Sequence, residues 1–377
     1  MGGPLSGVRV VELAGIGPGP HACMLLADLG ADVIRVDRPG GGMFGAGRAD
    51  VLNRGRPSVA LDLKHPRAVA TVLDLVERAD VLVEGLRPGT TERLGLGPEE
   101  CWARNPRLVY GRMTGWGQDG PLAPTAGHDL TYLAVSGALE HLGQDRSRPH
   151  FPGNLLGDFG GGSTYLVVGV LAALLEARAS GRGQVVDAAI VDGVAHLNAI
   201  GATMQAVGLA GEERASGLID GGAPFYDLYE TADGRHVAVG ALEPQFYAEL
   251  VERLGLAETA PSRDDPARAD DLRALLAETF RGRTQAAWVE LFEGSDACVA
   301  PVLTLGEAAE HPHLRARGTL VEHGGIVQPA PAPRFSRTPA ELGTPPREPG
   351  ADTRAALEAW GISDVAGLLA AGAAVQA

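Results

Sequence analysis

The amino-acid sequence predicts an α/β protein, with a large domain built on a parallel sheet and a smaller α+β domain after it. Three observations predict this fold class. Short apolar strands alternate with helical patterns through the first half of the 377 residues. A glycine-rich turn, GIGPGP at residues 15–20, follows the first strand. From about residue 224 the alternation gives way to a hairpin and then helices, which is typical of a separate domain.

The first half contains short runs of apolar and β-branched side chains that predict strands. They are residues 8–13, 31–36, 59–63, 81–84, 108–113 and 184–188. Apolar residues at helical spacing predict helices at 21–29, 67–78, 160–179 and 192–207. Because strands that are joined through helices pair in parallel, we expect a doubly wound, Rossmann-like sheet.

The second half reads differently. Ala232-Asp233-Gly234 is a hairpin signal between two short apolar runs. The expected elements are strands 226–231 and 236–240 and helices 243–254, 267–281, 285–293 and 353–360. These patterns predict a large domain over 1–195, a linker over 196–223, a small α+β domain over 224–325 and a proline-rich connector over 326–350, with 330–377 returning to the large domain.

The glycine-rich turn is a poor dinucleotide site. Such a loop works through backbone N–H groups that point at a pyrophosphate, and Pro18 and Pro20 have none. Pro20 instead suits the first turn of a helix. The strand over 31–36 runs into Asp37-Arg38, and an arginine at this place suits a ribose that carries an extra phosphate. Coenzyme A carries such a phosphate.

Composition excludes several classes of function. A net charge of −15 argues against general nucleic-acid binding, although arginines just after predicted strands favour a small polyanionic ligand. No uncharged apolar run of about 18 residues and no secretion leader is seen, so we expect no membrane partner. The three cysteines, Cys23, Cys101 and Cys298, are too scattered for a disulfide framework or a metal site, which makes the cytoplasm the expected location.

Two segments contain residues suited to acid–base chemistry. The first is AGHDL at 126–130, with His128, and the second is GDFGGG at 157–162, with Asp158. A histidine in such a loop is often a packed or surface residue, and an aspartate before a helix is often an N-cap. Alternatively, the glycines let a substrate approach the backbone, and N–H groups at the helix start stabilise a developing oxyanion. The residues alone leave both interpretations open.

Nearly the whole chain resembles the family III CoA transferases, also called the CaiB/BaiF family. The resemblance rests on stretches such as VVELAGIGPGPHA, LADLGADVIRVDRPGG, VEGLRPG, RMTGWGQDGP, LLGDFGGGS and GRGQVVDAAIVDG. Within the family the chain is most similar to the racemase branch. That similarity rests on Ala126-Gly127-His128-Asp129 and on EPQFY at 243–247, because typical transferases lack the histidine.

The resemblance implies a CoA thioester as the small-molecule partner, an interlocked homodimer and no separate cofactor, since CoA is part of the substrate. It implies that Arg38 meets the nucleotide end of CoA. The other implied CoA-binding positions are Leu61, Asp62, Leu63, Lys64, Gly85, Leu86, Arg87 and Arg93, with Gly127, Asp129, Leu130, Thr131 and Tyr132 beside the acyl thioester.

The racemase branch implies racemisation of 2-methylacyl-CoA. We hypothesise that His128 and Asp158 face opposite sides of the α-carbon and exchange acid and base roles with direction. Glu243 would orient His128, and backbone N–H groups at 158–160 would hold the enolate oxygen. One conflict arises, because a helix N-terminus lowers the pKa of Asp158 whereas a proton donor needs it raised.

Two other activities share these residues. In a CoA transferase Asp158 would be a nucleophile that forms a mixed anhydride and then an aspartyl-CoA thioester. His128 separates the two enzymes, because transfer between acids does not require it. A non-catalytic acyl-CoA-binding protein is the third alternative.

Overall fold

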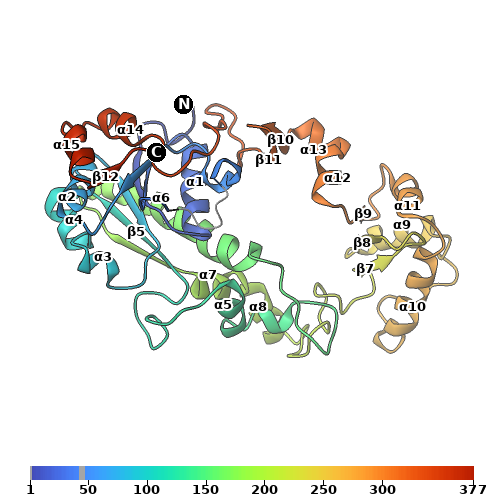
Figure 1. Ribbon diagram of the computed structural model, residues 1–377. Coiled ribbons are helices and arrows are strands. Elements are labelled where there is room, and N and C mark those ends of the chain that lie inside the picture. The colour runs from blue at the N-terminus through green and yellow to red at the C-terminus, as the bar shows by residue number, and fades with distance from the viewer. Residues whose placement is uncertain (1, 42–46) are drawn as a thin grey trace. The chain divides into compact units, whose positions relative to one another are not determined.

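The computed structural model describes residues 2–41 and 47–377 and divides into two compact units (Figure 1). The first unit comprises Met1–Ser136, Gly153–Leu197 and Pro312–Ala377, and the second comprises Gly137–Pro152 and Asn198–His311. Compared with the predicted domains, residues 312–325 belong to the large unit, and residues 137–152 belong to the small one.

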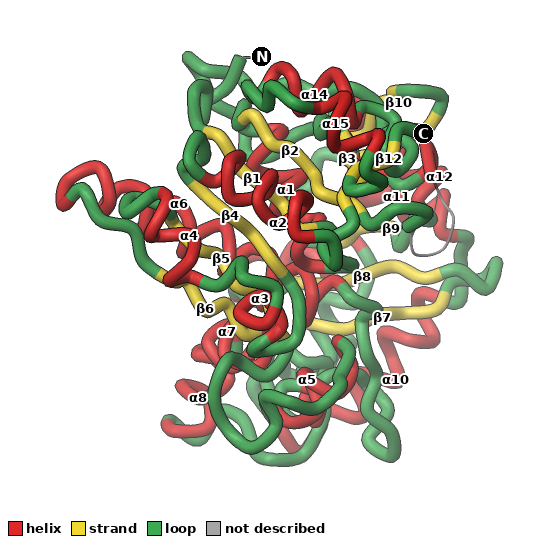
Figure 2. Tube along the Cα trace, turned by 60° about the vertical axis from the view of Figure 1, so that its left-hand side comes forward, coloured by secondary structure: helices red, strands yellow, loops and turns green. Residues whose placement is uncertain are grey.

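A seven-stranded sheet forms the centre of the first unit within the described residues, and Figure 2 shows its strands lying side by side. The order is β12-β3-β2-β1-β4-β5-β6, and every pairing is parallel except that of β12 with β3. The predicted Rossmann-like sheet is confirmed. The strands are β1 (Arg9–Leu13), β2 (Asp32–Asp37), β3 (Ser58–Leu61), β4 (Val81–Glu84), β5 (Val109–Thr114), β6 (Val185–Ala189) and β12 (Ala374–Val375).

Helices cover both faces of this sheet. On one face, Leu82 and Tyr110 share a core with α2 (Pro66–Val76), α14 (Thr353–Ala359) and α15 (Val365–Ala370). The next residue of β5, Gly111, points the other way, toward Leu166 and Val170 of α6 (Thr164–Ser180). The remaining helices of the unit are α1 (Pro18–Asp28), α3 (Thr90–Arg93), α4 (Pro98–Arg104), α5 (Asp129–Val135), α7 (Ile190–Leu197) and α13 (Pro312–Arg317).

The second unit has a sheet and core of its own. The strands β7 (Tyr226–Glu230), β8 (His236–Gly240) and β9 (Val299–Pro301) pair antiparallel in that order. Phe280 and Trp288 pack with Tyr229 in a core that includes buried residues of both sheet and helices. The helices are α8 (Ala199–Ala206), α9 (Pro244–Arg253), α10 (Ala269–Phe280), α11 (Gln285–Phe292) and α12 (Leu305–Glu310). The predicted hairpin is present and is formed by β7 and β8.

Some predicted elements differ from the structure. The expected helix over 192–207 is two helices, α7 and α8, which break at Asn198 and belong to different units. Asn198 and Gly201 mark the division in the sequence, but the apolar residues on either side of them predict one helix. The predicted connector at 326–350 begins as a strand, because β11 (Ile326–Pro329) pairs with β10 (Leu320–His323).

The long apolar helix is the other difference. Helix α6 starts at Thr164 and is preceded by a π-helix, η4 (Leu155–Ser163), rather than continuing an α-helix from residue 160. Among the described residues the combined stretch Leu155–Ser180 is the one helix long and apolar enough to cross a membrane by length and composition. Helix α6 packs against β5 and β6 of the central sheet.

Candidate active site

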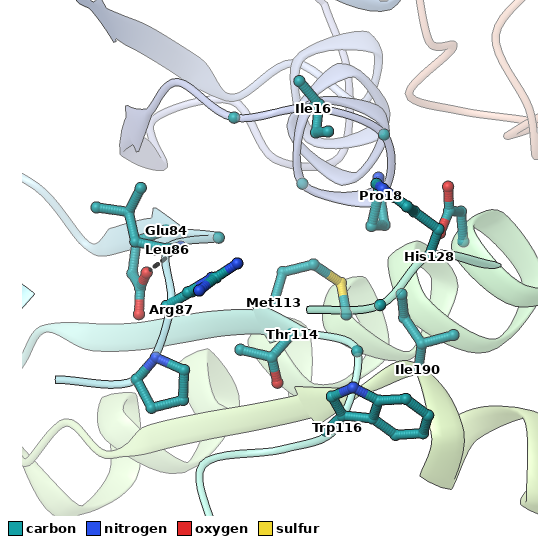
Figure 3. Close-up of a pocket in the computed structure, with 18 of the residues that line it drawn as sticks. Ile16, Pro18, Glu84, Leu86, Arg87, Met113, Thr114, Trp116, His128 and Ile190 are labelled. Atoms are coloured by element: carbon teal, nitrogen blue, oxygen red, sulfur yellow. Dashed lines mark hydrogen bonds between the residues drawn. The ribbon is translucent and has the colours of Figure 1, made fainter. Parts of the chain in front are cut away.

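A cavity of about 360 Å³ opens at the carboxyl ends of β1, β4 and β5 (Figure 3). The strand order reverses between β1 and β4, and ligands of open α/β sheets bind at such a switch point. His128 and Asp158 both line this cavity. In Figure 3 Pro18 and His128 lie close together on the right, with Ile16 above them and Trp116 below. The structure thus brings together the two residues that the sequence suggested for acid–base chemistry.

The glycine–proline turn forms the wall next to Asp158. Helix α1 begins at Pro18, and the residue before it, Gly17, has a φ of 65°. A methyl group on Gly17 would lie 3.1 Å from Oδ2 of Asp158. Only glycine combines this backbone conformation with such a close approach. The turn therefore makes room for a carboxyl group.

Asp158 lies inside η4 and is not the N-cap of the following helix. Its backbone N–H donates to Oδ2 of Asp129 at 2.6 Å, and the N–H of Phe159 donates to the carbonyl of Asn154 at 3.2 Å. These donors are already used, so the predicted role of the Asp158 and Phe159 N–H groups at the enolate oxygen is wrong. The error arose because no local pattern contains the tertiary hydrogen bond from the Asp158 N–H to the Asp129 carboxylate.

Close packing of η4 on α7 explains its glycines. A methyl group on Gly161 would lie 2.8 Å from the backbone nitrogen of Val194. A methyl group on Gly193 would lie 1.9 Å from the carbonyl oxygen of Gly161. The two backbones touch where neither residue has a side chain. Short π-helical stretches often occur at functional sites.

The conflict over the pKa of Asp158 is decided by burial. The pKa of this carboxyl is raised from 3.8 to about 6, because burial and, to a lesser extent, the nearby Asp129 carboxylate outweigh the lowering effects of His128 and of a hydrogen bond from Asn154. Near neutral pH both protonation states of Asp158 are therefore accessible. A group that must accept a proton in one direction and donate it in the other needs this property.

The backbone of His128 is fixed by hydrogen bonds to the side chain of Thr131. His128 is the N-cap residue of α5, its N–H donates to Oγ1 of Thr131 at 3.0 Å, and that hydroxyl donates to the His128 carbonyl at 2.7 Å. The residue is exposed, in contrast to the half-buried Asp158. The imidazole is therefore accessible to a ligand that enters the cavity.

Tyr132 forms the wall below His128. Its buried ring packs so closely on Gly115 and Gly127 that a methyl group on either would overlap it. The same ring meets Trp116 edge to face, with the centroids 4.8 Å apart. Gly127 and Tyr132, both predicted CoA-binding positions, thus line the cavity.

The opposite end of the cavity is formed by the turn after β4. Gly85, Leu86 and Arg87 line it, as the resemblance implied. Glu84, the last residue of β4, accepts a hydrogen bond from the Leu86 N–H at 2.7 Å, which Figure 3 draws as a dashed line. Burial raises the pKa of Glu84 to about 7 against the opposing effects of that bond and of Arg112. Sequence reasoning missed Glu84, although a carboxylate at the end of a predicted strand was a usable signal.

Arg38 lines a second cavity, of about 880 Å³, which shares the Gly15–Gly17 turn and Pro20 with the first. Arg35 and Arg347 also line it, and neither was among the predicted CoA-binding positions. Arg35 is buried and bonded to Asp37 at 2.7 Å, but its Nη1 has no partner. Basic side chains of the first unit thus line the second cavity, which adjoins the one lined by His128 and Asp158.

The other predicted CoA-binding residues line neither cavity. Leu61 is buried in the core at the end of β3, and Asp62 accepts a hydrogen bond from the backbone N–H of Lys64. Their roles stay predictions, and the set comprises Leu61, Asp62, Leu63, Lys64, Arg93, Asp129, Leu130 and Thr131. Within the described residues, 2–41 and 47–377, no three His, Cys, Asp or Glu side chains come together as metal ligands.

Glu243 belongs to the second unit, where it precedes α9 and is exposed. Its carbonyl accepts a long hydrogen bond from Arg263 at 3.5 Å. Orientation of His128 by this carboxylate stays a prediction.

A family model for CoA-transferase family III matches residues 5–353. The alpha-methylacyl-CoA racemase of Mus musculus is 46% identical over 363 residues, which cover 95% of this chain and 94% of the relative. The human alpha-methylacyl-CoA racemase is 44% identical over 365 residues, with the same two coverages. A crystal structure of a CAIB/BAIF family protein from Brucella suis, 28% identical, superposes with a TM-score of 0.79 and covers 95% of this chain and 99% of its own.

The fold and the site define an α/β protein that presents acid–base groups at the switch point of a Rossmann-like sheet. The chain belongs to CoA-transferase family III. The relatives named racemase are similar to it over nearly its whole length.

Proposed function

We propose that this protein is a racemase of 2-methylacyl-CoA thioesters. One observation carries the proposal: an exposed imidazole and a half-buried carboxyl with a pKa of about 6 line the same cavity at the sheet's switch point. The similarity to two proteins named alpha-methylacyl-CoA racemase supports it.

The reaction moves one proton between the two faces of a carbon. In one direction neutral His128 takes the α-proton while protonated Asp158 delivers a proton to the opposite face. In the reverse direction the Asp158 carboxylate is the base and the imidazolium is the acid. Because the C–H bond is a weak acid, both groups must be positioned before transfer begins, and effects of this kind contribute about 10²–10⁴-fold.

The enolate oxygen needs hydrogen-bond donors. The first N–H groups of a helix have no intrahelical acceptor, and α5 starts directly after His128. For the role that was first expected at residues 158–160 we propose the N–H groups of Asp129 and Leu130, which follow His128 directly but do not line the cavity of the free protein. A donor at such a position contributes about 3 kcal/mol to transition-state stabilisation.

CoA enters as part of the substrate, and no separate cofactor takes part. Arg38 and Arg35 at the second cavity would meet the phosphates of its nucleotide end. The pantetheine chain would pass along the Gly15–Gly17 turn that both cavities share. The thioester would then lie between His128 and Asp158.

The alternative function is CoA transfer between carboxylic acids through an aspartyl-CoA intermediate on Asp158, which the family name favours. One experiment separates the two. A single enantiomer of a 2-methylacyl-CoA is incubated in D2O with the protein and no other acid. Racemisation predicts α-deuteration with loss of optical activity. Transfer predicts no exchange, and movement of CoA only after a second acid is added.

The chain would act as an intertwined homodimer in the cytoplasm. Val168 and Leu175 of α6 are 59% and 68% exposed, and Leu155 of η4 is 68% exposed. An apolar surface of this kind on a central helix favours burial against another copy. Light scattering after size-exclusion chromatography tests the mass, and a monomer at micromolar concentration would exclude a stable dimer.

A further inference from the structure

The ring of His21 joins α1 to the π-helix that carries Asp158. Its Nδ1 lies 2.6 Å from Oγ of Ser163, which is fully buried. The same ring stacks on Phe159, with the centroids 4.3 Å apart and the planes 22° from parallel. Phe159 follows Asp158 directly, and Ser163 is the last residue of η4. One side chain thus contacts the π-helix at two positions, one of them beside the acid.

His21 works through contact and not through charge. Burial, with smaller effects of the guanidinium groups of Arg54 and Arg56, lowers the pKa of this imidazole to about 4, so the ring is neutral at physiological pH. His21 is not among the residues that line either cavity. Any effect of His21 on a ligand in these cavities therefore acts through the residues that its ring contacts.

Helix α1 fixes Asp158 from a second point. The Gly17 backbone at the start of this helix faces Oδ2 of Asp158 at a distance that leaves no room for a side chain. The carboxyl end of Asp158 is thus limited by Gly17, while its neighbour Phe159 is covered by His21. A shift of η4 relative to α1 would change both contacts together.

We propose that His21 is a positioning residue, whose ring holds the π-helix against α1 so that the Asp158 carboxyl stays in the cavity opposite His128. This inference rests on the proposed function only for its effect on turnover. The expected position of Asp158 is a property of the free protein.

The test uses variants that separate the two contacts. His21→Ala removes both the stacking and the hydrogen bond. His21→Phe keeps a ring over Phe159 and loses the bond, and Ser163→Ala removes the same bond from its other side. His65→Ala is the matched control, because His65 also accepts one hydrogen bond at a helix start, from the Arg67 N–H at 3.1 Å, but lines neither cavity.

Two measurements are made on each variant. The first is the titration of the Asp158 carboxyl in the free protein by ¹³C NMR, with the signal assigned through Asp158→Asn. The groups that act on this carboxyl are Asp129, His128 and Asn154, and none of the variants changes them. The second is kcat and KM for α-deuteration of a 2-methylacyl-CoA. Thermal unfolding reports whether each variant is folded.

We expect His21→Ala to admit water beside Asp158 and to lower its titration midpoint by about one pH unit toward the ordinary value. We expect kcat to fall about tenfold with KM within about twofold, because orientation of the acid is lost and binding is not. His21→Phe and Ser163→Ala should each lower kcat by about threefold, since one contact of two remains.

His65→Ala should change neither the midpoint nor kcat. A folded His21→Ala protein with the wild-type midpoint and kcat would overturn the proposal, as would equal changes in His65→Ala. If His21→Ala does not fold, His21→Phe and Ser163→Ala decide by the same criteria. If the wild-type protein shows no α-deuteration, the proposed function fails, while the carboxyl titration still decides the role of His21.

Discussion

Asp158 and His128 line one cavity but stand in different surroundings. Asp158 is half-buried in a π-helix, its N–H donates to Asp129, a side chain on Gly17 would crowd its carboxyl, and His21 of α1 stacks on its neighbour Phe159. His128 is exposed at the start of a short helix. The first unit therefore buries the acid in part and shifts its protonation, whereas it leaves the imidazole open to a ligand.

The contacts of α1 and η4 thus shape the surroundings of Asp158. Changes in α1 and η4 should act on the Asp158 face of the substrate. If Glu243 orients His128 as proposed, changes at Glu243 should act on the His128 face.

The largest effect is expected from removing either acid–base group. Asp158→Asn and His128→Ala should each lower racemisation by at least about 10³-fold, because every turnover needs both groups. Each variant should still exchange the α-proton of one enantiomer, the one that faces the group that remains. NMR of each enantiomer in D2O measures this. Exchange of both enantiomers at the wild-type rate in either variant would show that the two faces are not divided between these residues.

A smaller, one-sided effect is expected from Glu243→Gln. If this carboxylate orients His128, its loss should slow exchange on the His128 face by about 10–100-fold and leave the Asp158 face unchanged. Glu252→Gln, an exposed carboxylate on the following helix, is the control and should be silent. Equal slowing on both faces would mean that Glu243 supports the fold of its unit and not the imidazole.

Gly17→Ala should act on the other face. Both Gly17 and Gly181 have positive φ, so alanine at either position costs about 1 kcal/mol in stability. Only at Gly17 does the added methyl group reach Asp158, because nothing lies within 4 Å of a methyl group on Gly181. We expect about tenfold slower exchange on the Asp158 face for Gly17→Ala alone. Equal kinetics for the two variants would remove α1 from the description of the acid.

The sequence predicts the sheet well and the site only in outline. Strands such as Val81–Glu84 are apolar, short and bounded by turn residues, so local patterns suffice. The GIGPGP turn likewise predicts a helix start from its local pattern alone. The approach of Gly17 to Asp158 and the bond from Asp129 join residues far apart in the chain, and no local pattern contains them.

The π-helix also could not be predicted from local sequence patterns. The segment after Leu155 has the composition of a glycine-rich loop and a helix start, and both interpretations of Asp158 followed from that. Its actual form depends on the contact between the backbones of Gly161 and Gly193, which brings η4 onto α7. The raised pKa of Asp158 comes from its burial and from the nearby Asp129, and the sequence alone left its direction an open conflict.

The smallest expected effect is on stability, and it concerns Asp158 alone. The folded pKa of about 6 lies above the ordinary value of 3.8, so the folded protein holds this proton more tightly than the unfolded chain. The contribution of Asp158 to stability is therefore greatest at low pH, declines as the pH rises between these two values and is constant above them.

Asp158→Asn has no carboxyl to ionise, and at neutral pH it should be more stable than the wild type by about 1 kcal/mol after allowance for partial exposure. Urea unfolding at about pH 4.5 and about pH 7.5 measures the difference. Asp192→Asn, an exposed residue of α7, should keep the wild-type pH dependence. If Asp158→Asn also keeps that dependence, Asp158 carries no unfavourable charge in the folded protein, and its surroundings do not differ from those of His128 in the way that the division between the two faces requires.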